Sequence, residues 1–308
     1  MASTGQREEE KRKNRGSNDP IATLKNPTIE NTGSGELGHP YIIGCTGTKG
    51  GVGTTTVALN VAMTFVQLGQ KVIYVEMSHH FGSVAWQLGM PQPAPVNFGS
   101  LNPKEVDANF IAKVLMTHST GLQICCLSPW VDDDGHHISA EILKTLLREL
   151  ATQAHTIILD FPLERSNSTA LFLQLSQLLN VVMDVDPMNI AAAKMQLKFV
   201  HRQSHAPVFL TGVNRINIPP AESLRQIQDE MECATFTMIP SASELCYTAN
   251  IQHLPLVCIK PSSTTGLHFV KLRDQILSHL NGDDTENSRD RRGKHRRKKD
   301  RRHSSDGW

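Results

Sequence analysis

The residues best suited to chemistry in this 308-residue chain lie in the stretch GTKGGVGTTT at positions 47–56. A short apolar run, YIIGC at 41–45, precedes this stretch, and an apolar-periodic run, VALNVA at 57–62, follows it. Glycines let backbone N–H groups turn toward an anion, and the first turn of a helix adds partial positive charge. This order is typical of a phosphate-binding loop, and we expect the backbone N–H groups of residues 50–55 to cradle phosphates.

The position of the lysine separates this loop from an ordinary P-loop, in which a lysine after the last loop glycine reaches the β/γ-phosphates. Here Thr54 follows Gly53, and Lys49 stands at the front of the loop. The stretch KGGVGTTT at 49–56 resembles the deviant Walker A box (KGGxGKTT) of the MinD/ParA family. The resemblance implies that Lys49 reaches the partner's phosphates across a nucleotide-sandwich dimer, and that Thr55 is the hydroxyl on the magnesium side. Thr54 departs from the pattern.

Two other interpretations of the loop remain open. It is compatible with a tight turn between strand and helix that binds no ligand. It is also compatible with a dinucleotide fold, in which Gly51 and Gly53 begin a G-x-G-x-x-G motif and Glu76 is the ribose carboxylate. In that fold the third glycine position would be Thr56, and Lys49 would have no role.

Composition limits the class of protein. Hydrophobic residues make up 39% of the chain, and no apolar run approaches the roughly 18 residues needed to span a bilayer. The first residues lack the apolar segment of a secretion signal. The six cysteines show no C-x-x-C spacing, so we expect reduced, mostly buried thiols in a cytoplasmic protein.

Apolar strand-like runs alternate with helical ones from residue 41 onward, which is typical of a parallel sheet with crossover helices. We predict an α/β fold: a doubly wound, mostly parallel sheet with helices on both faces, as in P-loop NTPases. The predicted strands are 41–45, 71–75, 122–127, 156–160, 181–185, 208–213 and 235–239. The predicted helices are 55–68, 139–152, 166–179, 187–201, 220–231 and 265–280.

Charge and composition divide the chain into three parts. Residues 1–38 are polar and poor in apolar side chains, and we expect a disordered leader. Residues 39–281 form the predicted MinD/ParA-like nucleotide-binding domain. Residues 282–308 form an expected disordered polybasic tail, because residues 289–303 carry ten Lys and Arg against two Asp within a chain of net charge +1. Such a tail can contact anionic membrane or nucleic acid, or can simply be solvated.

The segment after the second strand reads Glu76, Met77, Ser78, followed by paired histidines. The resemblance places the family's switch I here, with a D-x-D pattern whose second Asp helps to position the attacking water. Ser78 cannot replace a carboxylate, so hydrolysis is predicted to be weak. We expect His79–His80, and His136–His137 further on, to lie in solvated loops rather than in metal sites, and residues 91–109 to be loop-like.

An acid closes the apolar strand at 156–160, which is the Walker B arrangement in which a carboxylate helps to hold magnesium. The sequence Asp160-Phe161-Pro162 also matches the D-x-P of the family's switch II. We therefore predict a Mg²⁺ site at Thr55 and Asp160. The alternative is that Asp160 only caps the following turn.

The strand at 208–213 ends in Asn214-Arg215, the pair found where the MinD/ParA family recognises adenine. An asparagine amide can bond both donor and acceptor edges of a base, although a turn residue is an equal alternative. Pro240 lies in a segment that resembles the other side of the base site. The predicted nucleotide-binding residues are Lys49, Gly50, Gly51, Val52, Gly53, Thr54, Thr55, Thr56, Asn214, Arg215 and Pro240.

Within the family, a loop without the second lysine most resembles the CpaE/TadZ branch, whose members help to localise and assemble Tad-type pili. The resemblance implies an ATP- and Mg²⁺-binding protein that forms a nucleotide-dependent homodimer, acts on pilus-assembly or other cargo proteins, and hydrolyses ATP weakly or not at all. It would be cytoplasmic, with peripheral contact at the inner face of the membrane as a further expectation. No catalytic residue is assigned.

Two further functions stay open: an active ParA-like ATPase that positions cargo on DNA or membrane, and a nucleotide-free scaffold. Whether Lys194 or Arg165 folds toward the phosphates in place of the missing lysine is also open.

Overall fold

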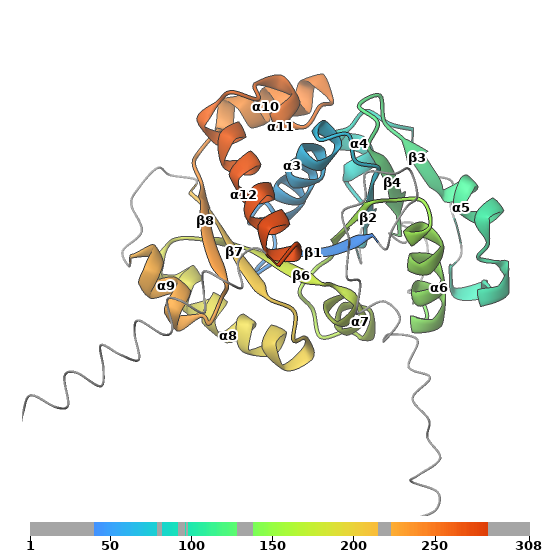
Figure 1. Cartoon of the computed structure of the whole chain (residues 1–308), viewed down its shortest axis with the longest axis horizontal. Helices are drawn as coiled ribbons and strands as arrows, with labels where there is room; N and C mark the ends of the chain where they lie inside the picture. Colours follow the sequence, from blue (N-terminus) through green and yellow to red (C-terminus); the bar gives the residue numbers. More distant parts are fainter. Residues whose placement is uncertain are drawn as a thin grey trace, which may run out of the picture.

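The structure, a computed structural model, describes residues 40–78, 82–91, 96, 98–127, 138–214 and 223–282. These residues form an eight-stranded sheet in the order β3-β4-β2-β5-β1-β6-β7-β8 (Figure 1). The strands are β1 (Tyr41–Gly47), β2 (Val72–Glu76), β3 (Leu115–Thr117), β4 (Gln123–Cys126), β5 (Thr156–Asp160), β6 (Leu178–Asp184), β7 (Val208–Val213) and β8 (Thr235–Ile239). Neighbouring strands run parallel, apart from the antiparallel pair β3 and β4. The predicted fold class is therefore confirmed.

Helices connect the strands. They are α3 (Thr54–Gln67), α4 (Val84–Gln87), α5 (Ala108–Val114), α6 (Ala140–Ala151), α7 (Asn167–Leu175), α8 (Pro187–Gln203), α9 (Leu224–Glu230), α10 (Ser243–Gln252), α11 (Leu256–Ile259) and α12 (Thr264–Leu280). Two short 3-10 turns, η1 (Phe98–Ser100) and η2 (Pro103–Glu105), lie in the segment expected to be loop-like.

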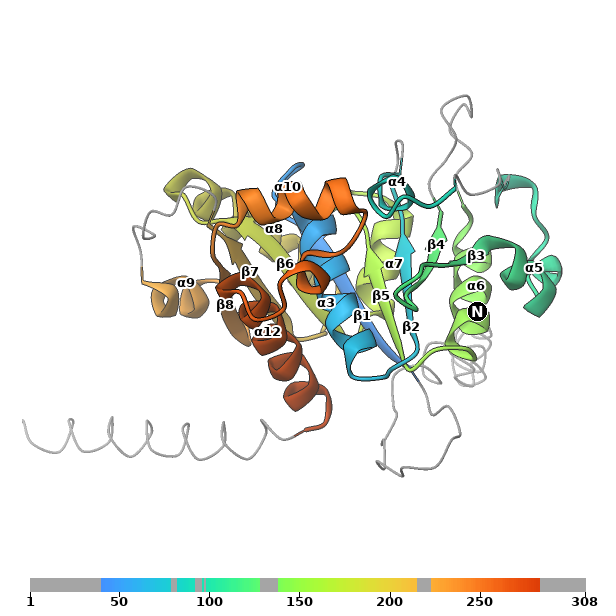
Figure 2. The same ribbon diagram turned by 90° about the horizontal axis from the view of Figure 1, so that it is seen from above.

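The sheet separates two hydrophobic cores because successive strand side chains point to opposite faces. Along β1, Ile42 packs into one core while Ile43 packs into the other. Helices α6, α7 and α8 cover the first face, and α3, α11 and α12 cover the second, an arrangement that both views show (Figures 1 and 2). This two-sided burial explains why the central strands are mostly apolar.

One predicted boundary is wrong. The helix predicted at 166–179 ends at Leu175, and β6 begins at Leu178 rather than at residue 181. Ser176 leaves the helix with an extended backbone, and the N–H of Gln177 donates to the carbonyl of Ile42 at 2.8 Å. Leu178 then pairs with β1. Because Leu171, Leu175, Leu178 and Leu179 recur at helical spacing, periodicity alone could not separate the last helical turn from the start of a strand.

One strand and four helices were not predicted from the sequence: β3, α4, α5, α10 and α11. Strand β3 has three residues and pairs antiparallel with β4 at the edge of the sheet. Helix α10 has one buried residue, Ala249, so it lacks the apolar stripe that identifies an amphipathic helix.

Some expectations fall outside the described residues and stay predictions, namely the leader, the basic tail and the two histidine pairs. Within the described ranges, no helix is both long enough and apolar enough to cross a bilayer. All six cysteines are described and are free thiols, with Cys45 and Cys125 fully buried.

A buried asparagine joins the helix of the glycine-rich loop to the C-terminal part of the chain. The amide of Asn60 donates to the carbonyl of Thr56 at 2.8 Å, and its oxygen accepts from the N–H of Val257 at 3.0 Å. Asn60 is only 2% exposed. The bond to Val257 holds α11 against α3 at a point where water cannot substitute.

We predict that Asn60→Ala lowers the free energy of unfolding by about 2 kcal/mol, because it leaves the buried N–H of Val257 without a partner. Asn250→Ala is the matched control, since that amide bonds Gln87 at the exposed surface and its loss is expected to change the same quantity by less than about 0.5 kcal/mol. Urea unfolding of both variants measures the difference. Equal stability of the two variants would contradict the role assigned to Asn60.

Candidate functional site

The glycine-rich loop connects β1 to α3, and the structure explains why three of its positions are occupied by glycine. Gly51 and Gly53 have φ values of 74° and 97°, in the left-handed region that favours glycine. Gly47 is fixed by space instead, because an added Cβ would lie 2.2 Å from Oγ1 of Thr54. The loop therefore folds back tightly over the first turn of α3.

The N-terminus of α3 has no side-chain cap. Its N-cap residue is Gly53, and its first turn contains no acidic residue. By contrast, Ser139, Ser166 and Asp186 each cap the helix that they precede. The first N–H groups of a helix lack intrahelical partners and lie at its positive end, so those of α3 remain available to an anion.

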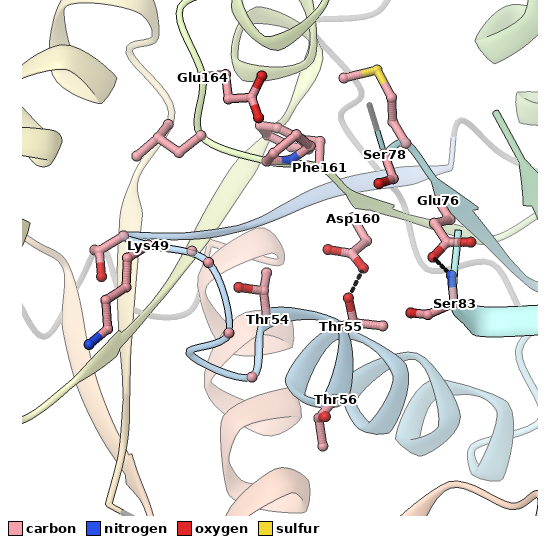
Figure 3. Close-up of a pocket in the computed structure, with 18 of the residues that line it drawn as sticks. Lys49, Thr54, Thr55, Thr56, Glu76, Ser78, Ser83, Asp160, Phe161 and Glu164 are labelled. Atoms are coloured by element: carbon pink, nitrogen blue, oxygen red, sulfur yellow. Dashed lines mark hydrogen bonds between the residues drawn. The ribbon is translucent and has the colours of Figure 1, made fainter. Parts of the chain in front are cut away.

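A cavity of about 730 Å³ lies over this loop (Figure 3). Its walls come from residues 47–51, 53–56, 76–78, 83, 160–164 and 196. The hydroxyl of Thr48 is buried without a hydrogen-bond partner although the residue lines the cavity. A buried polar atom of this kind is a position at which a ligand can supply the missing bond.

Asp160 ends β5, which lies between β1 and β2 in the sheet. Its Oδ2 accepts hydrogen bonds from Oγ1 of Thr55 at 2.7 Å and from the hydroxyl of Tyr74 at 2.6 Å. Burial raises the pKa of Asp160, and these two hydrogen bonds lower it in part. The structure thus brings together the two residues predicted to hold magnesium.

The donor set at this point fits Mg²⁺. Magnesium prefers oxygen ligands and usually takes one or two from the protein, with the rest from phosphate and water. Thr55 supplies a hydroxyl oxygen and Asp160 a carboxylate oxygen, directly beside the open N-terminus of α3. Within the described residues, no group of three or more His, Cys, Asp or Glu side chains could form a separate metal site.

Glu76 ends β2 and is paired in register with Asp160. Its Oε1 accepts from the backbone N–H of Ser83 at 2.8 Å and of Val84 at 3.2 Å, so it anchors the start of α4. Burial raises the pKa of Glu76, the bond from Ser83 lowers it, and the nearby charge of Asp160 raises it further. Ser78, at the switch I position, also lines the cavity.

Lys49 lines the outer end of the cavity and is half-exposed. Its Nζ lies 3.0 Å from Oδ2 of Asp184, the last residue of β6. Figure 3 shows the Lys49 side chain directed away from Asp160 and Thr55. In this state the lysine is bound to a carboxylate of its own chain.

Neither of the cations considered as a replacement for the missing lysine lines the cavity. Lys194 forms an ion pair with Glu230 of α9. Arg165 precedes α7 and is not part of the cavity wall. Thr54, which stands where the ordinary lysine would be, contributes only a hydroxyl.

The predicted adenine residues lie further along the same edge of the sheet. Asn214 and Pro240 follow β7 and β8, and the N–H of Asn214 donates to the carbonyl of Ile239 at 3.0 Å. Neither residue lines the cavity, and Arg215 lies outside the described residues. Their role in binding a base stays a prediction.

Tyr74 and Gln196 are among the residues at the site that were not predicted from the sequence. Tyr74 bonds Asp160 from within an apolar strand, and the two-residue period that places it on the face of Glu76 could have identified it. Gln196 reaches the cavity wall from α8, and only the packing of that helix reveals this.

No protein-family model matches the chain, and no curated protein sequence matches it. Several solved structures, by contrast, are similar to this chain. A ParA family ATPase from Chlorobium tepidum is similar with a TM-score of 0.66 and 16% identity over 76% of this chain and 97% of that one. The cell division ATPase MinD of Pyrococcus furiosus is similar with a TM-score of 0.59 and 20% identity over 77% of this chain and 98% of that one. MinD of Pyrococcus horikoshii, solved with Mg-ADP, is similar with a TM-score of 0.58 and 17% identity over 79% of this chain and 99% of that one.

The sheet order and the glycine-rich loop at the end of β1 define an α/β P-loop NTPase fold. More particularly, it is the fold of the ParA and MinD ATPases.

We predict a pH-dependent effect of Glu76→Gln on the stability of the ligand-free protein. The pKa of Glu76 is raised by folding, so its ionisation destabilises the folded state increasingly as pH rises through the folded-state value. Gln can still accept from Ser83 and Val84 without carrying charge. The variant should melt at a higher temperature than wild type at neutral pH, and the difference should vanish below the ordinary glutamate value of 4.5.

Thermal unfolding followed by circular dichroism over this pH range is the measurement. Glu141→Gln, an exposed substitution on α6, is the control and should show no such trend. A Glu76→Gln gain that is independent of pH would contradict a charge effect.

Proposed function

We propose that this chain is a nucleotide-binding protein of the MinD/ParA family that binds Mg-ATP in the cavity over the glycine-rich loop, dimerises when ATP is bound, and hydrolyses ATP slowly or not at all. The observation that carries the proposal is the uncapped N-terminus of α3 beside the Thr55–Asp160 pair. The similarity to nucleotide-binding ATPases of the same fold supports it.

In this proposal the backbone N–H groups of residues 50–55 bind the phosphates, and Thr55 and Asp160 hold Mg²⁺. Three features are compatible with phosphate in this loop: the positive-φ glycines, the close contact at Gly47 and the hydrogen-bonding potential of the buried Thr48 hydroxyl. When bound, the magnesium ion would neutralise phosphate charge.

Weak hydrolysis follows from two residue identities. Thr54 replaces a charged donor by a hydroxyl, and Ser78 replaces a carboxylate that would orient water. Losing one charged donor removes about 3 kcal/mol or more of transition-state stabilisation. The chain is therefore better suited to a binding switch than to fast turnover.

Dimerisation depends on Lys49 in this proposal. The Lys49 side chain is half-exposed although Asp184 is only 14% exposed, and in this proposal the lysine exchanges its bond to Asp184 for one to a phosphate of the partner subunit. We propose that ATP-driven dimers localise or assemble cargo, with Tad-type pilus assembly as the specific role. The basic tail would add contact with anionic membrane or nucleic acid.

A nucleotide-free scaffold is the second candidate. The observation that favours it is the charge of the cavity wall, where three carboxylates, Glu76, Asp160 and Glu164, outnumber one lysine that is already bound to Asp184. In a scaffold the fold would serve protein contacts alone.

We predict that wild-type protein binds Mg-ATP and shifts to a dimer, whereas Lys49→Ala binds Mg-ATP but weakens the dimer at least about tenfold, because a charged hydrogen bond across the interface is lost. Lys113→Ala, an exposed lysine of α5, is the matched control and should behave as wild type. Calorimetric titration together with light-scattering mass measures both steps. If wild type gains no thermal stability from saturating Mg-ATP and Thr54→Lys does, the scaffold function replaces the one proposed.

A further inference from the structure

We propose that Tyr74 is a positioning residue that makes the candidate metal site selective for Mg²⁺ over Ca²⁺, because it holds one oxygen of Asp160 on the protein and leaves the other for a cation. The inference rests on the function proposed above and deepens it, since it names the residue that selects the metal of the nucleotide complex. Tyr74 lies within β2, outside both the glycine-rich loop and the segment that follows β5.

The sheet brings Tyr74 to Asp160 from a neighbouring strand. Strands β2 and β5 run parallel, and Tyr74 is paired in register with Ile158, two residues before Asp160. Side chains two residues apart on a strand share a face, so Tyr74 and Asp160 lie diagonally on the side of the sheet that α3 covers. The long side chain of the tyrosine spans this diagonal, and its hydroxyl donates to Oδ2 of Asp160 at 2.6 Å.

The bond between Tyr74 and Asp160 is shielded from water. Tyr74 is fully buried, and Asp160 is only 6% exposed. Hydrogen bonds to a carboxylate are stronger than those between neutral groups, and a buried acceptor that loses its donor is costly. The tyrosine hydroxyl therefore holds the carboxylate of Asp160 in one orientation.

The two oxygens of Asp160 have different surroundings. Oδ2 accepts from Tyr74 and also from Oγ1 of Thr55 at 2.7 Å, which uses both lone-pair directions of that oxygen. Among the residues that the structure describes, none donates a hydrogen bond to Oδ1. Figure 3 shows the second oxygen directed away from Thr55, on the side of Thr54. Asp160 can thus offer one oxygen to a cation in the cavity.

A single carboxylate oxygen suits Mg²⁺ better than Ca²⁺. Magnesium is small, demands near-octahedral geometry and keeps several waters, whereas calcium takes more ligands and often binds both oxygens of a carboxylate. To use both oxygens of Asp160, a calcium ion would have to displace the buried hydroxyl of Tyr74 from Oδ2. Thr55 sets no such limit, because its hydroxyl can offer lone pairs to a cation while its proton stays on Oδ2.

The test measures binding of a fluorescent ATP analogue in excess MgCl₂ and in excess CaCl₂. For wild type we expect the affinity with Ca²⁺ to be at least about tenfold lower than with Mg²⁺. Tyr74→Phe frees Oδ2 for a second metal contact, so the ratio of the two affinities should fall at least about threefold. Tyr41→Phe is the matched control, because it removes a hydroxyl that bonds Asn281 at the other end of β1 from the cavity, and it should keep the wild-type ratio.

A Tyr74→Phe variant that loses affinity equally with both cations would show a purely structural role and overturn the inference. Equal affinity of wild type in both solutions would also overturn it, while the proposed function would stand. If wild type binds the analogue with neither cation, the proposed function fails and this inference with it. Should Tyr74→Phe fold poorly, Tyr74→Met, which fills the space with an adaptable side chain and no hydroxyl, gives the same comparison with the same two outcomes.

Discussion

The hydrogen bond between Oγ1 of Thr55 and Oδ2 of Asp160 joins the first turn of α3 to the end of β5, and the arrangement of the cavity depends on it. The bond forms because β5 lies next to β1, so that the chain leaving β1 through the glycine-rich loop begins its helix above the carboxyl end of β5. Ligands of open α/β sheets gather at this edge. The packing of α3 under α11 and α12 holds the helix in that position.

Two opposed electrostatic features meet at this point. The uncapped helix end carries about half a positive charge and, with the loop N–H groups, favours an anion. The carboxylates of Glu76 and Asp160, both largely buried, oppose it. A lysine at position 54 would offset the charge of these carboxylates with a cationic side chain of the protein itself. At position 54 this chain has a threonine, which adds a neutral hydroxyl and no charge.

Much of this could be predicted from the sequence because its signals are local. The glycines, Lys49 and the acid after the apolar run 156–159 sit at fixed offsets from buried strands, and the strand–helix alternation gives the fold class. Contacts between distant segments could not be predicted. The pairing of Lys49 with Asp184 joins residues from separate strands, and Gln196 reaches the cavity only through the packing of α8.

The errors in the predicted helices and strands also arise because contacts between distant segments cannot be predicted from local pattern. Leucines at helical spacing continue from the end of α7 into the start of β6, and the backbone bond from Gln177 to Ile42 marks where the chain joins the sheet instead. Helix α10 was missed because its exposed face carries large apolar residues, Tyr247 and Ile251, where a polar face would be expected. Tertiary contacts, rather than local pattern, decide both cases.

The most direct test of the central claim is hydrogen–deuterium exchange of the full chain with and without Mg-ATP. The account predicts slower exchange at the backbone amides of residues 48–56 and 160–164, because those N–H groups would bind or be covered by the nucleotide, with little change in α9. Unchanged exchange at residues 48–56 in saturating Mg-ATP would contradict the assignment of the loop as a nucleotide site.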